Sequence, residues 1–256
     1  MNTEGIVLVT GGSRGIGAAT AALLSEQGSK VVVVDIQPEP IAGGAILWPA
    51  PFDVASEDAV VAGVADIEKA HGPISGLVNA AGVFGKMHRL EKVRMEQWDR
   101  EVDIDLRGTF MMARSVGVRM AERGFGAIVN VASVAGMTSG PIHAYTAAKA
   151  GVIQVTQTLA AEWGRAGVRV NAVSPGFTRT VALEAGIASG AMNRELMQRY
   201  AAMNRMVEPI EVAQAIAWLL SPMSSAVTGV NLPVDCGFLA GATWGAYGGL
   251  PSAPAS

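Results

Sequence analysis

The chain has little charge, one cysteine and three histidines. Charged side chains make up 16% of its 256 residues, and the formal net charge is -3. Without a basic excess it lacks the cations that neutralise nucleic-acid phosphates, so no nucleic-acid partner is expected. Because Cys236 is the single cysteine, an internal disulfide framework is excluded and a reducing, cytoplasmic compartment is favoured. Because His71, His88 and His143 are dispersed and lack nearby paired acids or cysteines, no metal site is expected either.

Long apolar runs are also missing, although 50% of the residues are hydrophobic. A helix needs roughly 20 apolar residues to cross a bilayer, and the strand-like runs Ile6–Val9 and Val31–Val34 are much shorter. The first residues, Met1–Gly5, lack the charged-then-apolar pattern of a signal peptide. We therefore expect a globular protein without a membrane partner. Its high apolar content excludes a disordered chain.

Short apolar runs alternate with longer amphipathic stretches. Strands that are apolar throughout are buried on both faces, so this alternation predicts a Rossmann-like, doubly wound parallel sheet in a three-layer α/β/α arrangement. No repeat, linker or charge block marks a boundary, and residues 1–256 are expected to form one domain. The expected strands are Ile6–Thr10, Val31–Asp35, Ala45–Leu47, Leu77–Ala80, Ala127–Ala132, Val168–Val173 and Val230–Val234, and the expected helices are Ile16–Gln27, Ser56–Ala70, Trp98–Arg123, Tyr145–Arg165 and Glu208–Leu220.

The segment after the second strand interrupts this alternation. Within a helix an interior proline costs about 3 kcal/mol and a glycine about 1 kcal/mol. The helix after the second strand is therefore expected to be shortened or absent. The residues responsible are Pro38, Pro40, Gly43, Gly44, Pro49 and Pro51.

A glycine-rich turn, TGGSRGIG at Thr10–Gly17, joins the first strand to the first helix. Glycines let the backbone turn sharply and approach a pyrophosphate, and the helix N-terminus offers free N–H groups. A ligand-free strand-to-helix turn would look similar, but the acid that ends the next strand favours a dinucleotide site. The candidate residues in the turn are Gly11, Ser13, Arg14, Gly15, Ile16 and Gly17.

The acid that ends the second strand is Asp35. Its carboxylate can accept hydrogen bonds from both ribose hydroxyls of NAD and would repel the extra phosphate of NADP. Arg14 favours the opposite choice, because a guanidinium can pair with that phosphate. We give the acid more weight and expect NAD, with NADP as the weaker alternative.

Three polar residues follow in an order that suits acid/base chemistry. Ser133 comes after a predicted strand, and Tyr145 and Lys149 are four residues apart on one helix face. Singly, each has an ordinary structural explanation. Together, the ammonium and a bound nicotinamide would lower the tyrosine pKa from about 10. Tyr145 would then take the proton of an alcohol during hydride transfer, and Ser133 would bind the same oxygen.

The motifs TGGSRGIG, Asp53-Val54, Asn79-Ala80-Ala81-Gly82, Ser133 with YTAAK at 145–149, and Ser174-Pro175-Gly176 stand in this order. As a set they resemble the short-chain dehydrogenase/reductase family over about residues 6–237. The resemblance implies a homotetrameric NAD(P)-dependent enzyme that acts on a small alcohol or ketone. It also implies cofactor contacts for Asp53, Val54, Asn79, Ala80, Gly82, Tyr145, Lys149, Pro175, Gly176, Thr178 and Thr180.

One position departs from the family pattern. Where family members often carry Asn on the long central helix, this chain has Asp105. That Asn is thought to hold, through its main-chain carbonyl, a water that links the lysine to solvent. An aspartate has the same carbonyl, so we expect Asp105 to join the catalytic group, with the proton relay and pH profile altered.

The substrate pocket is less well defined. Residues 181–206 resemble the family's mobile lid, and residues 238–256 form a Gly/Ala/Pro-rich tail. Candidate substrate contacts are Ser133, Tyr145, His143 and Phe84. The apolar and polar residues of this region leave the substrate open: it could be a hydrophobic or cyclic alcohol, or a sugar or polyol. A non-catalytic NAD(P)-sensing regulator and an epimerase or dehydratase are the alternative functions.

Overall fold

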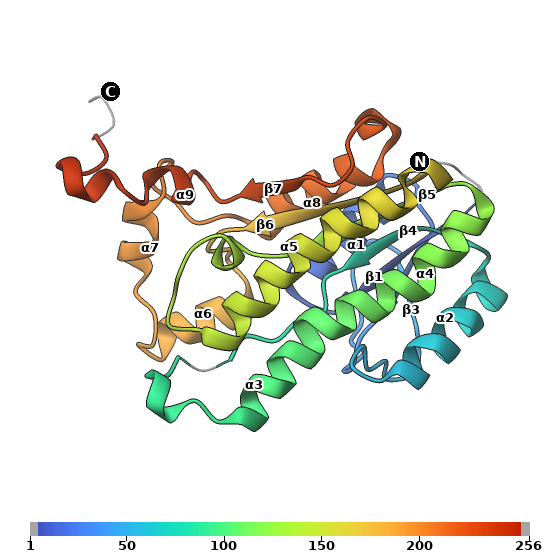
Figure 1. The fold of residues 1–256 in the computed structure, drawn as a ribbon, viewed down its shortest axis with the longest axis horizontal. Helices are drawn as coiled ribbons and strands as arrows, with labels where there is room; N and C mark the ends of the chain where they lie inside the picture. The colour runs from blue at the N-terminus through green and yellow to red at the C-terminus, as the bar shows by residue number, and fades with distance from the viewer. Residues whose placement is uncertain (1–4, 86, 252–256) are drawn as a thin grey trace.

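A computed structural model describes residues 5–85 and 87–251. Seven parallel strands form one sheet, with the order β3-β2-β1-β4-β5-β6-β7 (Figure 1). The order reverses between β1 and β4, and open α/β sheets bind ligands at such a reversal, outside the carboxyl ends of the strands. The strands are β1 Ile6–Thr10, β2 Val31–Val34, β3 Ile46–Leu47, β4 Ile74–Asn79, β5 Gly126–Val131, β6 Val168–Pro175 and β7 Asn231–Val234.

Helices cover both faces of this sheet, which confirms the predicted three-layer Rossmann-like fold. The helices are α1 Gly15–Glu26, α2 Glu57–His71, α3 Met95–Val102, α4 Thr109–Arg123, α5 His143–Trp163, α6 Val181–Ala188, α7 Arg194–Tyr200, α8 Pro209–Leu220 and α9 Phe238–Gly241. In Figure 1, α2, α4 and α5 lie in front of the sheet, and α1 and α8 lie behind it. Short 3₁₀ turns occur at Leu90–Lys92, Val134–Gly136, Gly164–Ala166, Pro222–Ser224 and Trp244–Tyr247.

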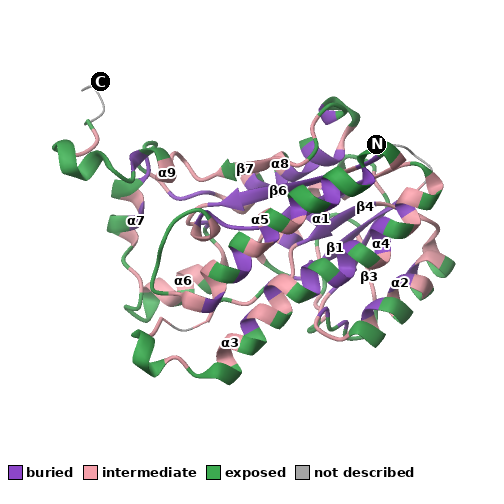
Figure 2. Ribbon diagram, in the orientation of Figure 1, coloured by how far each residue is buried: buried purple, intermediate pink, exposed green. Residues whose placement is uncertain are grey.

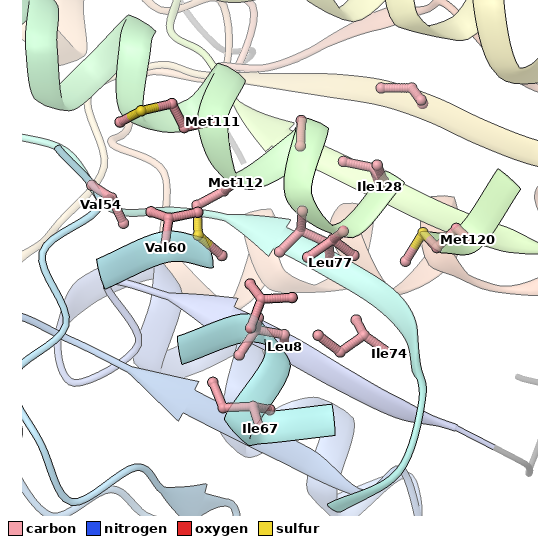
Figure 3. Close-up of a cluster of buried hydrophobic side chains, with 14 of the residues drawn as sticks. Leu8, Val54, Val60, Ile67, Ile74, Leu77, Met111, Met112, Met120 and Ile128 are labelled. Carbon is pink, nitrogen blue, oxygen red and sulfur yellow. The ribbon is translucent and has the colours of Figure 1, made fainter. Parts of the chain in front are cut away.

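Two large apolar cores, one on each side of the sheet, explain why the strands are mainly apolar. Successive side chains of a strand point to opposite faces. Leu8 of β1 packs into the core under α2 and α4 with Leu77 and Met112, as Figure 3 shows. Its neighbours Val7 and Val9 pack into the other core, with residues of α1 and α8. The inner strands are therefore buried, the edge strands β3 and β7 less so, and the helices keep exposed outer faces (Figure 2).

The segment between β2 and β3 contains no helix over residues 35–45, as its prolines and glycines predict. β3 is only two residues long and pairs in parallel with β2, Val32 opposite Ile46. Gly43 has a φ of +83°, and a Cβ there would lie 2.8 Å from the Ala22 Cα of α1. A side chain at this position is therefore excluded by both conformation and space.

The long helix in front of the sheet differs from the prediction of one helix over Trp98–Arg123. It begins earlier, as α3, and a π-helical segment at Asp103–Gly108 separates α3 from α4. The Thr109 hydroxyl donates to the Asp105 main-chain carbonyl at 2.9 Å within this wide turn. Such turns are frequent at functional sites, and this one lies under the cleft described below.

The predicted lid and tail both contain structure. Residues 181–206 hold α6 and α7, which an ion pair between Arg194 and Glu184 connects. The tail, red in Figure 1, extends away from the sheet through α9, and its Trp244 and Tyr247 are exposed. Residues 252–256 of the tail lie outside the described residues. Within the two described ranges, no helix has the length and apolar character that a membrane span requires.

Candidate active site

A cavity of about 870 Å³ opens at the carboxyl ends of β1, β2 and β4. Its position matches the reversal of strand order, where this fold binds ligands. The start of α6 forms part of the wall, through Val181, Ala182 and Ala185. Of the residues expected to bind the cofactor, the cavity is lined by Gly11, Arg14, Gly15, Asp35, Asp53, Val54, Ala80, Gly82 and Thr180.

The turn between β1 and α1 requires its glycines. Gly11 and Gly15 have φ values of +61° and +56°, in the left-handed region that favours glycine. A Cβ on Gly17 would lie 2.3 Å from the Gly11 carbonyl oxygen. α1 begins at Gly15 without a side-chain cap from Arg14, so its first N–H groups are free for an anion. The turn and the cavity fit the pyrophosphate of a dinucleotide cofactor.

Asp35 stands directly after β2, at the edge of this cavity. One carboxylate oxygen accepts the Ser13 N–H at 3.1 Å, and the other accepts the Gln37 N–H at 3.0 Å. These two bonds hold the carboxylate between the glycine-rich turn and the segment that follows β2. Its remaining lone pairs are free to accept bonds from ribose hydroxyls.

The three polar side chains that the sequence predicts to act together, Ser133, Tyr145 and Lys149, lie near one another at the carboxyl end of β5. The Lys149 Nζ donates to the Val131 carbonyl at 3.0 Å and lies 5.4 Å from the ring centroid of Tyr145. Ser133 follows β5, accepts the Ala135 N–H at 3.1 Å and lies near enough to Tyr145 to lower the pKa of the phenol. One helix face and one strand end thus bring a phenol, an ammonium and a hydroxyl together.

Asp105 contacts this group differently from the family pattern. Its carboxylate is fully buried, lies 3.1 Å from the Lys149 Nζ and accepts the Val83 N–H at 3.3 Å. Its main-chain carbonyl, which we expected to serve the proton relay, accepts the Thr109 hydroxyl. The acid at this position therefore forms a buried ion pair that an asparagine could not form.

The buried charges shift one another's pKa values. Burial raises the pKa of Asp105, and the Lys149 ammonium opposes this only in part. Burial lowers the pKa of Lys149, but the charges of Asp105 and Tyr145 outweigh burial and leave it raised. Burial raises the pKa of Tyr145 and Asp105 adds to this, while Lys149 and Ser133 lower it. Burial and Asp105 thus outweigh the fall in the Tyr145 pKa that was expected from the ammonium.

A chain of buried amides supports the same strands. Asn79 at the end of β4 donates to the Asn130 side chain of β5 at 2.9 Å, and Asn130 donates to the Thr156 hydroxyl of α5 at 2.9 Å. All three side chains are buried. The sequence analysis named Asn79 but missed its two partners. A polar residue inside the apolar strand Gly126–Val131 was the signal for Asn130.

Phe84 packs edge-on against Tyr145, with ring centroids 5.3 Å apart. It also lines a second cavity of about 840 Å³ with Val83 and His88. His143, the other expected substrate contact, begins α5 and lines neither cavity.

The remaining expected cofactor residues lie behind or beside the larger cavity. Gly176 follows β6, where a Cβ would come within 2.8 Å of the Asp235 Cα, and Thr178 donates to the Gly176 carbonyl at 3.1 Å. The residues that do not line the cavity are Ser13, Ile16, Gly17, Asn79, Tyr145, Lys149, Pro175, Gly176 and Thr178.

In the part of the chain that the structure describes, no group of three or more His, Cys, Asp or Glu side chains could hold a metal ion.

Comparison with known proteins identifies the family. Residues 11–239 match the family model described as enoyl-(acyl carrier protein) reductase. A 2,5-dichloro-2,5-cyclohexadiene-1,4-diol dehydrogenase of Sphingobium indicum is 39% identical over 243 residues, which cover 91% of this chain and 96% of the relative. A levodione reductase of Leifsonia aquatica is 36% identical and covers 92% and 94% of the two chains. The chain belongs to the short-chain dehydrogenase/reductase family.

The solved structures agree on the fold. One described as ribose-5-phosphate isomerase from Brucella melitensis 16M superposes with a TM-score of 0.93 and 43% identity over 98% of both chains. The name of that protein denotes an isomerase. What the two chains share is the fold and 43% of their aligned residues. The family and its dehydrogenase and reductase members make this chain a nicotinamide-dependent oxidoreductase of alcohols or ketones.

Proposed function

We propose that this protein oxidises a secondary alcohol to a ketone with NAD, or catalyses the reverse reaction, with Tyr145 as the general acid/base. The observation that supports this proposal is the meeting of Tyr145, Lys149 and Ser133 beside the dinucleotide cavity. A regulator that only senses the nicotinamide cofactor has no need of this group.

The proposed proton transfer uses side chains already in position. The Tyr145 oxygen takes the substrate's hydroxyl proton as the carbinol C–H electron pair leaves with its hydrogen as hydride. The nicotinamide, when bound, supplies the hydride acceptor. Ser133 donates a hydrogen bond to the same substrate oxygen, and the Lys149 ammonium favours the phenolate. Since burial and Asp105 raise the pKa of Tyr145, we expect the oxidation rate to rise with pH.

NAD is the proposed cofactor because Asp35 lies at the cavity with its carboxylate held by two N–H groups. Family membership leaves this choice open, since the related structure of ElxO, 26% identical, has NADP bound. The other cofactor roles implied by the family pattern, including the adenine site at Asp53 and Val54, stay part of this proposal. Replacing Asp35 with Ala is expected to narrow the NAD/NADP preference, measured as the ratio of the two kcat/KM values. An unchanged ratio would contradict this role for the carboxylate.

The substrate is proposed to carry a cyclic carbon skeleton. The Phe84 ring stands against Tyr145 and would pack on an apolar ring. The relative from Sphingobium is named for a cyclohexadiene diol, which favours a cyclic alcohol over a sugar or open-chain polyol. His143 stays a candidate contact at the start of α5, and residues 181–206 are the proposed lid.

We also propose a homotetramer in the cytoplasm. α4 and α5 present Phe110, Val118, Ala147 and Ala150 on their exposed sides, and small or apolar residues there permit close packing of a second copy. The free Cys236 suits a reducing compartment. Light scattering of the purified protein tests the assembly, and a monomer would contradict it.

The decisive experiment mixes the purified protein with NAD and a panel of cyclic alcohols, polyols and sugars. Oxidation produces the absorbance band of reduced nicotinamide, whereas a sensor binds NAD without it. Enzyme activity that is greatest with cyclic alcohols supports the proposal. Binding of NAD without turnover of any panel member would instead favour the sensor.

A further inference from the structure

The cation nearest to Asp35 in the glycine-rich turn is already paired. Arg14 Nε donates to Glu39 Oε2 at 3.0 Å, and a terminal guanidinium nitrogen contacts the other Glu39 oxygen. Arg14 lines the large cavity beside Asp35. Glu39 raises the pKa of Arg14 most, and Asp35, which lines the same cavity, raises it further.

Glu39 reaches Arg14 because the segment after β2 is held in place. The Glu39 N–H donates to the Ser13 hydroxyl at 3.1 Å, and the Ser13 N–H donates to Asp35 at 3.1 Å. Pro38 and Pro40 flank Glu39, and each proline fixes its own φ and restricts the residue before it. The sequence that prevents a helix here thus holds a carboxylate against the cofactor turn.

NAD and NADP differ at this point of the cleft. NADP carries a phosphate where NAD has a ribose hydroxyl, near the acid that ends the second strand. A guanidinium with free donors can bind a phosphate through two parallel bonds, but Arg14 directs its Nε and a terminal nitrogen to Glu39. The Glu39 carboxylate also adds a second negative charge to that of Asp35.

We propose that Glu39 is a cofactor-specificity residue, which occupies Arg14 and thereby excludes the ribose phosphate of NADP. This inference rests on the proposed dinucleotide site and deepens it. It separates two roles: Asp35 accepts the ribose hydroxyls, and Glu39 removes the one nearby group in the turn that would favour the phosphate.

The pair is exposed, since 59% of the Arg14 side chain and 45% of the Glu39 side chain are accessible. Solvent screens such pairs, so their effect on folding is small. Cofactor choice is a ratio of two affinities, and a change of a few fold in one of them is measurable. The expected effect is therefore about twofold to fivefold, the range that a screened charge gives.

The test measures equilibrium binding of NADH and NADPH by cofactor fluorescence, without substrate. Glu39→Gln removes the charge and keeps the shape. We expect the Kd for NADPH to fall by about twofold to fivefold while that for NADH stays nearly unchanged. The gain should shrink at high salt. Glu39→Ala repeats the measurement with a different residue.

Two controls accompany this test: a second exposed ion pair, and a variant that lacks the Arg14 guanidinium. Glu57→Gln removes the same charge from a similarly exposed pair with Arg114, neither of which lines the cavity, and should leave both affinities unchanged. In an Arg14→Gln background, Glu39→Gln should give little gain for NADPH. An unchanged NADPH/NADH ratio in Glu39→Gln, or an equal gain without Arg14, overturns the inference. If the unmodified protein binds neither cofactor, the proposed function fails as well.

Discussion

Two ion pairs lie next to residues that line the large cavity, and they use similar groups in opposite surroundings. Lys149 and Asp105 form the pair at the catalytic end, where 5% and 0% of their side chains are accessible. Arg14 and Glu39 form the pair at the proposed adenosine end, where 59% and 45% are accessible. Water screens the second pair but not the first. The buried pair of Lys149 and Asp105 should therefore affect the stability of the fold and the pKa values of its groups. The exposed pair of Arg14 and Glu39 should affect only the choice of cofactor.

Structure explains the difference in burial. Asp105 lies in the wide turn between α3 and α4, under Gly82, where an added Cβ would lie 2.5 Å from its carboxylate. Arg14 and Glu39 come from two connecting segments at the rim of the cleft, where backbone and side chains meet solvent. Four substitutions sharpen this comparison, and they follow from the largest expected effect to the smallest.

Tyr145→Phe should have the largest effect, on activity. Loss of the hydroxyl removes the proposed proton acceptor, and general acid/base groups contribute about 10²–10⁴-fold to rate. We expect kcat to fall by about 10³-fold, with NADH binding retained. Steady-state kinetics and cofactor fluorescence measure the two. Tyr247→Phe in the exposed tail is the control, and near-normal turnover of Tyr145→Phe would remove the phenol from the mechanism.

Lys149→Met should destabilise the fold, because it leaves the buried Asp105 carboxylate without its cation. Breaking a buried pair in this way costs about 3–5 kcal/mol. The free energy of unfolding in urea measures it, and Lys149→Met/Asp105→Leu should recover much of the loss.

The loss in Lys149→Met should also depend on pH. Burial raises the folded-state pKa of Asp105 above the unfolded value of about 3.9. The folded protein then binds a proton that the unfolded chain releases, so stability falls as pH rises through this interval. The loss should be greatest at neutral pH and smaller in acid. A loss that is independent of pH would argue against a buried, unpaired carboxylate.

Asp105→Asn should change the pH profile more than the rate. The substitution removes a charge that raises the pKa of Tyr145, while Lys149 and Ser133 still lower it. We expect turnover within about tenfold, with the midpoint of the oxidation profile moved to lower pH. Complete loss, a large gain in rate, or an unmoved midpoint would show a different role. Asp58→Asn in α2 is the matched control.

Glu39→Gln should have the smallest effect on folding. Exposed pairs contribute little to stability, since solvent screens them. We expect the thermal unfolding midpoint to stay unchanged although NADPH binding improves. A clear loss of stability would mean that the rim pair is structural, and the comparison between the two ends would fail.

Much of the fold was predictable because burial leaves a clear mark on the sequence. β1 was predicted to the residue, and the absence of a helix over residues 35–45 followed from proline and glycine. The expected helix Ser56–Ala70 is α2, and Ser56 is its N-cap, accepting the Ala59 N–H at 3.3 Å. The wide turn at Asp103–Gly108 was not predicted, because apolar periodicity does not distinguish a π turn from the regular helix around it.

The site residues also fall into those that local sequence predicts and those that it does not. Order along the chain identified Ser133, Tyr145 and Lys149, because a strand end and a four-residue helical spacing are local features. The ion pair between the Asp105 side chain and Lys149 was not predicted, since the family pattern drew attention to the main-chain carbonyl of Asp105. Asn130 and Glu39 were missed, because each matters only through a partner 26 or 25 residues away.

By itself the sequence determined the alternation of strands and helices, the glycine-rich turn and the order of the catalytic motif. These follow from local conformation and from the period of apolar residues. Only the tertiary structure decided which charges are buried and which partners they meet. Pairing across the fold depends on how distant segments pack, and the strength of each pair depends on the water that packing excludes.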